Sequence, residues 1–269
     1  MNILHISDTH FGTEIQATIE ALLEHLEEFP SQLVIFSGDI TQRARVSEFK
    51  AAAAFLRRLP DGPVMIVPGN HDIPLYNVLR RFSSPYGRYD EYLADFSLGQ
   101  DHMPTFDSDR VSITGLDTTD PARHKDGLIT EEHIQLTSER LRAAETHKLK
   151  IVFAHQPVDA ILEMDEKNIM HNAEPAIRQW AADGMDLYLG GHIHFPFMQP
   201  LRIRYPDIAH DAWTAQCGTT FSTRIRNKMP NSFNRICVGE TRNETKLERW
   251  EYDYGMRRFK LEERVEPWL

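Results

Sequence analysis

The sequence predicts an α/β fold in which parallel strands are joined by helices. Three short apolar-rich segments, residues 3–7, 33–36 and 64–67, are separated by two segments whose apolar residues recur at helical spacing. The second of these strands is continuously apolar, as expected when both faces of a sheet are covered. The β-α-β-α-β order therefore favours a parallel sheet with helical crossovers.

Each of the two expected helices has one apolar face and is followed by a residue that ends it. The apolar positions of the first helix are Ile15, Ile19, Leu22, Leu23 and Leu26. Those of the second are Phe49, Ala52, Ala53, Leu56 and Leu59. Pro30 follows the first helix, and Pro60 and Gly62 follow the second. Because proline cannot continue a helix, these residues set the limits of both.

The remaining elements follow from the same patterns. Residues 73–109 are irregular and predict a helical or loop insertion near the functional site. Further strands are expected at 111–116, 150–154 and 185–189, with helices from Thr130 to about His147 and over 173–183. Residues 197–263 alternate apolar and polar side chains, which predicts an antiparallel second sheet. With no linker or repeat in the sequence, residues 1–269 are expected to form a single domain.

The composition narrows the classes of function. The chain has 269 residues, of which 41% are hydrophobic, and a net charge of -10. No apolar run reaches the roughly 18 residues of a membrane span, and the N-terminus resembles a first strand more than a signal peptide, so a cytoplasmic protein is expected. The acidic charge disfavours a nucleic-acid polymer as partner. Two cysteines exclude a disulfide framework.

Five short motifs contain seven potential metal ligands, and four of the five follow an expected strand. The ligands are Asp8, His10, Asp39, Asn70, His155, His192 and His194. Ligands bind beyond the carboxyl ends of strands in open α/β sheets, so these residues are expected to converge. Within Asp8-x-His10 and His192-x-His194, extended residues two apart would point to the same side. Oxygen ligands mixed with imidazoles suit two divalent or trivalent ions, and manganese, iron and zinc all fit.

In this order, Asp-x-His, Gly-Asp, Gly-Asn-His-Asp, His and Gly-His-x-His resemble the signature of the calcineurin-like metallophosphoesterases. The resemblance implies a two-sheet α/β/β/α sandwich with a binuclear metal centre. It implies that Asp8, His10 and His194 hold the first metal, that Asn70, His155 and His192 hold the second, and that Asp39 bridges both. It further implies that His71 contacts the phosphate and stabilises or protonates the leaving oxygen, and that Asp72 orients the His71 imidazole.

The start of the chain, residues 3–11, is similar to bacterial class III cyclic-nucleotide and glycerophosphodiester phosphodiesterases. The purple acid phosphatases are disfavoured because Gln42 stands where they carry a tyrosine and His10 where they carry a glycine. The leading expectation is hydrolysis of a small phosphodiester, such as a 3',5'-cyclic nucleotide, by metal-bound hydroxide. A phosphomonoesterase or broad-specificity phosphatase is the alternative within the enzymes. A non-catalytic binding module on a phosphoesterase scaffold is the second alternative.

The sequence does not assign substrate-binding residues, and a homo-oligomer stays open. Several cationic residues follow the motifs, and one or two could reach a phosphate, with solvated charge expected of most. They are Arg43, Arg45, Arg202, Arg204, Arg224, Arg226 and Lys228.

Overall fold

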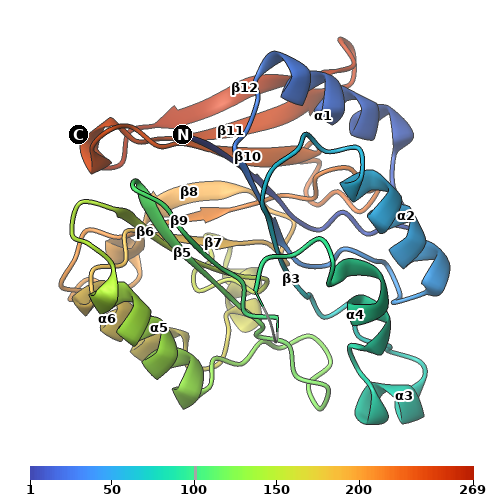
Figure 1. Ribbon diagram of the computed structural model, residues 1–269, viewed down its shortest axis with the longest axis horizontal. Helices are drawn as coiled ribbons and strands as arrows, with labels where there is room; N and C mark the ends of the chain where they lie inside the picture. Colours follow the sequence, from blue (N-terminus) through green and yellow to red (C-terminus); the bar gives the residue numbers. More distant parts are fainter. Residues whose placement is uncertain (100–101) are drawn as a thin grey trace.

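Two β-sheets face each other, and helices cover their outer faces (Figure 1). The computed structural model describes residues 1–99 and 102–269, so Gln100 and Asp101 of the expected insertion lie outside the described residues. This arrangement confirms the α/β class and the α/β/β/α sandwich.

The first sheet joins the beginning of the chain to its end. In the described part of the chain its order is β12-β11-β10-β1-β2-β3. Strands β1 to β3 are parallel, with Ile3 opposite Leu33 and Val34 opposite Val64. The strand bounds are β1 Asn2–Ile6, β2 Leu33–Ser37, β3 Val64–Val67, β10 Ser232–Cys237, β11 Lys246–Asp253 and β12 Arg258–Val265.

The second sheet is built from the middle of the chain, in the order β4-β5-β6-β7-β9-β8. Strands β5, β6, β7 and β9 are parallel, and the two edge strands β4 and β8 are antiparallel to their neighbours. The strand bounds are β4 Thr105–Asp107, β5 Val111–Leu116, β6 Leu149–Ala154, β7 Leu187–Gly190, β8 Phe197–Pro200 and β9 Trp213–Gln216.

The expectation that residues 197–263 form an antiparallel second sheet of their own is wrong. Strands β8 and β9 extend the second sheet, and β9 pairs parallel to β7. Strands β10 to β12 extend the first sheet, where Leu4 of β1 lies opposite Arg235 of β10. Alternation along a strand shows which residues share a face, but it carries no information on which existing edge the strand will cover.

Two pairs of helices flank the sandwich, and shorter helices fill the connections. Helices α1 and α2 lie on the side of the first sheet, and α5 and α6 on the side of the second (Figure 1). The bounds are α1 Gln16–Glu28, α2 Val46–Leu56, α3 Val78–Ser83, α4 Gly87–Leu93, α5 Glu131–Ala143 and α6 Ala173–Ala182. Three short 3₁₀ helices span Glu163–Asn168, Leu201–Ile203 and Arg242–Glu244. In the described part of the chain, no helix combines the length and apolar character required to cross a membrane.

Helix α5 begins where the sequence indicated but ends earlier. The Thr130 hydroxyl accepts a hydrogen bond from His133 N at 3.1 Å, so it caps the helix as expected. The helix ends at Ala143, because Ala144 is extended and the chain must turn to enter β6 at Leu149.

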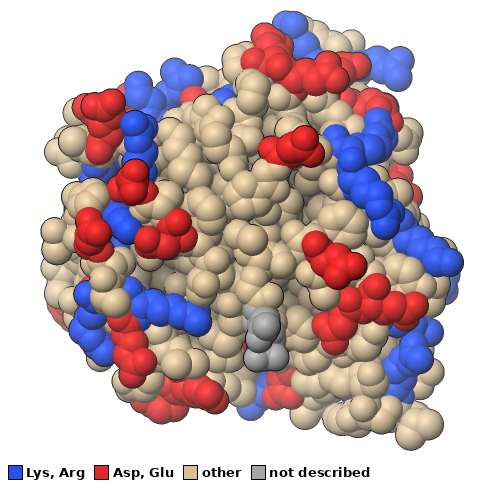
Figure 2. All heavy atoms as spheres, in the orientation of Figure 1, with Lys and Arg blue, Asp and Glu red and all other residues tan. Residues whose placement is uncertain are grey.

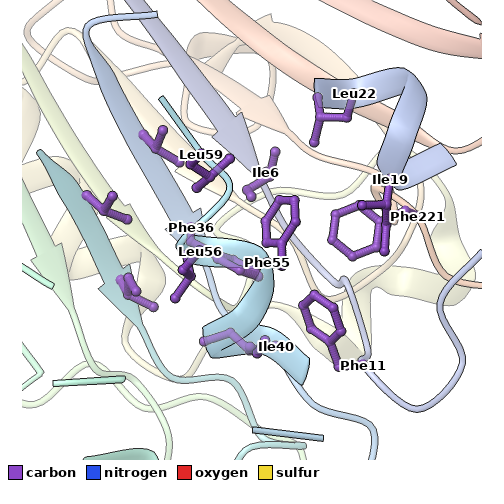
Figure 3. Packing of buried hydrophobic residues seen from close by; sticks show 14 of the residues in the cluster. Ile6, Phe11, Ile19, Leu22, Phe36, Ile40, Phe55, Leu56, Leu59 and Phe221 are labelled. Carbon is purple, nitrogen blue, oxygen red and sulfur yellow. The ribbon is translucent and has the colours of Figure 1, made fainter. Parts of the chain in front are cut away.

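Three apolar clusters hold the layers together. One lies between the two sheets and includes Ile35, Met65 and Phe153. A second packs α1 and α2 onto the first sheet, where Leu22 of α1 and Phe55 of α2 lie over the sheet (Figure 3). A third packs α5 and α6 onto the second sheet around the fully buried Trp180. This rigid frame holds the loops at the carboxyl ends of the strands.

The buried His25 of α1 is expected to make the folded state less stable as the pH falls. Its ring centroid lies 4.5 Å from that of Trp250 and 4.9 Å from that of Phe29. Burial lowers the pKa of His25 to about 4, and Arg235 acts in the same direction. Unfolded histidine titrates near pH 6.5, so between that pH and about 4 only the unfolded chain takes up this proton. The folded state therefore loses up to about 1.4 kcal/mol per pH unit as the pH falls through this window.

The measurement is urea unfolding at several pH values for the wild type and for His25→Gln, which cannot titrate. The variant should show the shallower pH dependence below pH 6.5. Equal slopes for the two proteins would mean that His25 is not excluded from protonation in the fold.

Candidate metal centre

The seven expected ligands all follow strands, four of them in the first sheet and three in the second. Asp8, Asp39 and Asn70 come directly after β1, β2 and β3 or within three residues of them. His155 follows β6, and the pair of histidines at 192 and 194 follows β7. Because the carboxyl ends of parallel strands lie at one edge of a sheet, the site forms where these edges of the two sheets meet.

The first group of donors comprises Asp8, His10, Asp39 and His194, all buried, with ligand atoms within 4.8 Å of one another. His194 Nε2 lies 3.1 Å from Asp8 Oδ1 and 3.0 Å from His10 Nε2. His10 Nε2 lies 3.7 Å from Asp39 Oδ2. Two carboxylates and two imidazoles thus point at one small volume, which is the donor set of a transition-metal ion.

The second group comprises Asp39, His155 and His192, so Asp39 belongs to both groups. His155 Nε2 lies 3.2 Å from Asp39 Oδ1 and 3.3 Å from His192 Nδ1. Among the described residues, no hydrogen-bond partner reaches the buried Oδ1 atom of Asn70. A buried oxygen without a partner is costly unless a cation or water satisfies it. The residues present therefore fit two metal ions.

Five of the seven ligands have a backbone conformation that residues with side chains rarely adopt. Their φ angles are +52° for Asp8, +43° for His10, +49° for Asp39, +72° for His192 and +53° for His194. The expectation that both residues are extended in Asp8-x-His10 and in His192-x-His194 is therefore wrong. Left-handed residues cost free energy, and they persist where the surrounding structure determines them, commonly at functional sites.

Hydrogen bonds to the main chain orient the imidazoles. Nδ1 of His155 lies 2.8 Å from Ser37 O, and Nδ1 of His194 lies 2.6 Å from Arg224 O. Since a carbonyl only accepts, each Nδ1 is the donor, and each Nε2 faces the cluster, where it can bind a metal ion in place of a proton. This is the usual outer support of metal-binding histidines.

The charges of the cluster also favour cations. Burial acts to raise the pKa of both carboxyl groups, but His194 beside Asp8 and His155 beside Asp39 outweigh it and hold each pKa below its ordinary value. Burial opposes the charge on His155, yet Asp39 raises its pKa to about 9. Burial lowers the pKa of His192 to about 3. Anionic carboxylates therefore lie beside His155, whose positive charge a metal ion can replace, and beside neutral imidazoles such as that of His192.

His71 lies at the edge of the cluster, with Nε2 4.0 Å from Asp39 Oδ2. Its main-chain N–H donates to Asp39 Oδ1 at 2.8 Å. Its Nδ1 lies 2.7 Å from Gln42 O and therefore donates to that carbonyl. The ring is thus held by the main chain of the Gly-Asp loop, with Nε2 facing the site.

The expectation that Asp72 orients the His71 imidazole is wrong. The Asp72 carboxylate accepts hydrogen bonds from the main-chain N–H groups of Ile40, Thr41 and Gly69 at 3.1, 2.8 and 2.9 Å. Burial, and then the nearby Asp39, raise the pKa of Asp72 to about 6. Asp72 therefore ties the loop after β2 to the loop after β3, and it supports Asp39 and Asn70 through the backbone.

The model of the calcineurin-like phosphoesterase family matches residues 1–196. The chain belongs to this family. The activity for which this family is named, hydrolysis of phosphoesters, agrees with the donor set described above. A comparison with curated proteins finds no match.

Solved structures of the same fold include two phosphatases. One is a purple acid phosphatase from seeds of yellow lupin (Lupinus luteus), with 13% identity and a TM-score of 0.71 over 98% of this chain and 53% of the other. This calcineurin-like phosphoesterase thus spans about half the length of the lupin enzyme. The other is a dimetal phosphatase from Danio rerio, with 14% identity and a TM-score of 0.65 over 93% of this chain and 95% of the other. At such identities the likeness shows the fold alone.

The insertion and the late loops of the phosphoesterase also reach the site. A pocket beside the cluster is lined by Gln42, Arg43, Asn70, His71, Leu75, Tyr76 and His124. Leu75 and Tyr76 belong to the expected insertion, whose main elements in the described residues are α3, α4 and β4. The carbonyl of Gln42 and the side chain of Arg224 also contact His71, which sequence reasoning did not foresee. The only sequence signal was the cationic character of the segment around Arg224.

Gly191 is a position where an added side chain would disturb the candidate metal centre directly. A Cβ atom there would lie 1.9 Å from Ser7 Oγ and 2.4 Å from Asp8 Oδ2. Ser7 Oγ donates to Asp8 Oδ2 at 2.7 Å, and His192 N donates to the same oxygen at 2.9 Å. We expect Gly191→Ala to displace Asp8 and to weaken binding of the first metal by roughly 10- to 100-fold, the range for disturbed outer support of a metal ligand.

The measurement is metal content by elemental analysis after dialysis at limiting manganese. Gly62→Ala is the matched control, because the nearest atom to its added Cβ is Gln32 O at 3.6 Å. Unchanged metal content in Gly191→Ala would show that Asp8 does not depend on this contact.

Proposed function

We propose that this chain is a dimetal phosphodiesterase that hydrolyses a small phosphodiester, with 3',5'-cyclic nucleotides as the leading substrates. The observation that carries the proposal is the pair of donor groups that share Asp39, with His71 beside them. The preference for a diester rests on the similarity of residues 3–11 to cyclic-nucleotide and glycerophosphodiester phosphodiesterases. A small-molecule partner agrees with the enclosed position of the site.

In this proposal Asp8, His10 and His194 hold one metal, Asn70, His155 and His192 hold the other, and Asp39 serves both. When bound, such a pair neutralises phosphoryl oxygens and makes water nucleophilic near neutral pH. Manganese, iron or zinc would suit the donors. The Asn70 amide contributes no charge, which limits the repulsion of an anionic substrate.

His71 would carry the proton that the leaving alkoxide needs. The hydrogen bond from Nδ1 to Gln42 O fixes the ring, so that Nε2 faces the cluster. A positioned acid of this kind typically contributes roughly 10²–10⁴-fold to the rate. The pocket that Leu75, Tyr76 and His124 line also has Asn70 and His71 in its wall, and in this proposal it receives the alcohol part of the ester.

The test is parallel hydrolysis of bis(p-nitrophenyl) phosphate and p-nitrophenyl phosphate with manganese supplied, and with a chelator control. Chelator-sensitive preference for the diester supports the proposal and leads to a screen of cyclic nucleotides and glycerophosphodiesters. Preference for the monoester supports a phosphatase instead. A protein that binds two metals per chain but turns over neither ester, nor any member of the screen, would be a binding module.

A further inference from the structure

Arg224 lies in the loop between β9 and β10, and it contacts the candidate centre twice. Its main-chain carbonyl accepts the hydrogen bond from His194 Nδ1. Its side chain then turns toward the cluster, where Nη1 lies 3.1 Å from His71 Nε2 and 3.2 Å from Gln42 Oε1. The same nitrogen lies 3.4 Å from His10 Nδ1. A single guanidinium therefore spans the gap between a ligand of the first metal and His71.

We propose that Arg224 binds the phosphate group of the substrate, with Gln42 holding its guanidinium in place. The proposal rests on the function proposed above, and it assigns a substrate-binding residue where the sequence motifs assign none. A guanidinium matches the planar geometry of two phosphate oxygens and forms charge-assisted hydrogen bonds with them.

Comparison with the neighbouring arginines indicates that the positive charge of Arg224 is available to bind an anion. Arg226 pairs with the buried Asp165, and Arg204 Nε lies 2.6 Å from the buried Asp159. Among the described residues, no carboxylate lies within ion-pair distance of Arg224, which contacts only neutral oxygen and imidazole nitrogen acceptors. Arg226 and Arg204 therefore stabilise loops. The charge of Arg224, in contrast, is uncompensated in a half-buried position beside the cluster.

The direction of the hydrogen bonds adds a second argument. Because a guanidinium carries donors only, His71 Nε2 and Gln42 Oε1 must accept from it. In the free site Arg224 thus holds the Nε2 lone pair of His71, and Nε2 can carry the proton for the leaving oxygen only once the guanidinium has turned to the phosphate. A phosphate oxygen that entered here would replace neutral acceptors by an anionic one, and the hydrogen bond to it would be the stronger.

The experiment compares the metal-loaded wild type with Arg224→Gln, Arg224→Lys and the control Lys228→Gln, which removes one exposed positive charge from the same loop. Affinity for inorganic phosphate is measured by calorimetry, kcat and KM with the chromogenic diester, and metal content by elemental analysis. We expect Arg224→Gln to keep two metals per chain and to weaken phosphate binding by roughly 10- to 100-fold, the loss typical of a hydrogen bond to a charged group. Arg224→Lys should recover part of this loss, because it restores the charge without the planar fork.

Unchanged phosphate affinity in Arg224→Gln would overturn the proposal. Loss of metal from Arg224→Gln but not from Lys228→Gln would overturn it too, because Arg224 would then act on the ligands. Arg224-dependent phosphate binding by a wild type that hydrolyses no ester would refute the proposed function and leave this inference standing. If the wild type is active, and Arg224→Gln has the same phosphate affinity and the same KM as the wild type, the role of Arg224 is refuted and the proposed function stands.

Discussion

Asp39→Asn is expected to abolish phosphoester hydrolysis and to remove most of the bound metal. Among the residues that the structure describes, Asp39 alone belongs to both donor groups, with Oδ1 3.2 Å from His155 Nε2 and Oδ2 3.7 Å from His10 Nε2. Asparagine has the same shape, but it lacks the charge and offers one ligand oxygen in place of two. Metal ions contribute several kcal/mol of transition-state stabilisation, so we expect turnover to fall by roughly a thousandfold or more.

The measurement is metal content together with hydrolysis of the better chromogenic ester at saturating manganese. Asp61→Asn, at an exposed position between α2 and β3, is the matched control and should behave as the wild type. Far-UV circular dichroism shows whether each variant is folded. If Asp39→Asn is folded, active and holds two metals, then Asp39 does not bridge the ions.

His71→Ala is expected to keep both metals and to lower kcat by roughly 10²–10⁴-fold, the contribution of a general acid. The side chain makes its Nδ1 hydrogen bond to Gln42 O and extends Nε2 toward the site, yet it does not belong to either group of His, Asp and Glu donors that could hold an ion. The loss should depend on the leaving group. An ester with a weakly basic p-nitrophenolate leaving group needs little protonation, whereas an alkyl diester needs it fully.

The measurement is kcat for a series of esters with leaving groups of increasing basicity, with the exposed His147→Ala as control. A steeper dependence in His71→Ala than in the wild type shows that the proton comes from His71. A uniform loss across the series would assign His71 a different role. Collapse of the metal content would make it a ligand.

The strands and helices that position the site could be predicted because their signals are local. The apolar segments at 33–36 and 64–67 became β2 and β3, and Thr130 caps α5. The net charge of -10 carried less information, since acidic and basic side chains are interspersed around the rim of the face in Figure 2. Order along the chain also indicated that the five motifs would converge, because parallel strands place their carboxyl ends together.

The pairing of the late strands could not be predicted, because it depends on edges that exist only after folding. Strand β10 covers the edge of β1, more than 200 residues away in sequence. In the same way, the bonds that tie Asp72 to Ile40, Thr41 and Gly69 join two loops from neighbouring strands. A motif such as Gly-Asn-His-Asp identifies the residue types but does not show which of them faces which partner.

The sequence by itself predicted the α/β class, the family and seven candidate donor side chains, because these follow from local periodicity and from chemically distinctive residues in a specific order. Only the tertiary structure decided the left-handed backbone of five of these donors and the approach of Arg224 to His71. The physical reason is that each of these features requires two sheets to meet at one edge. The energy that holds Asp8 or His194 in an unfavourable conformation comes from contacts with strands and loops distant in the sequence.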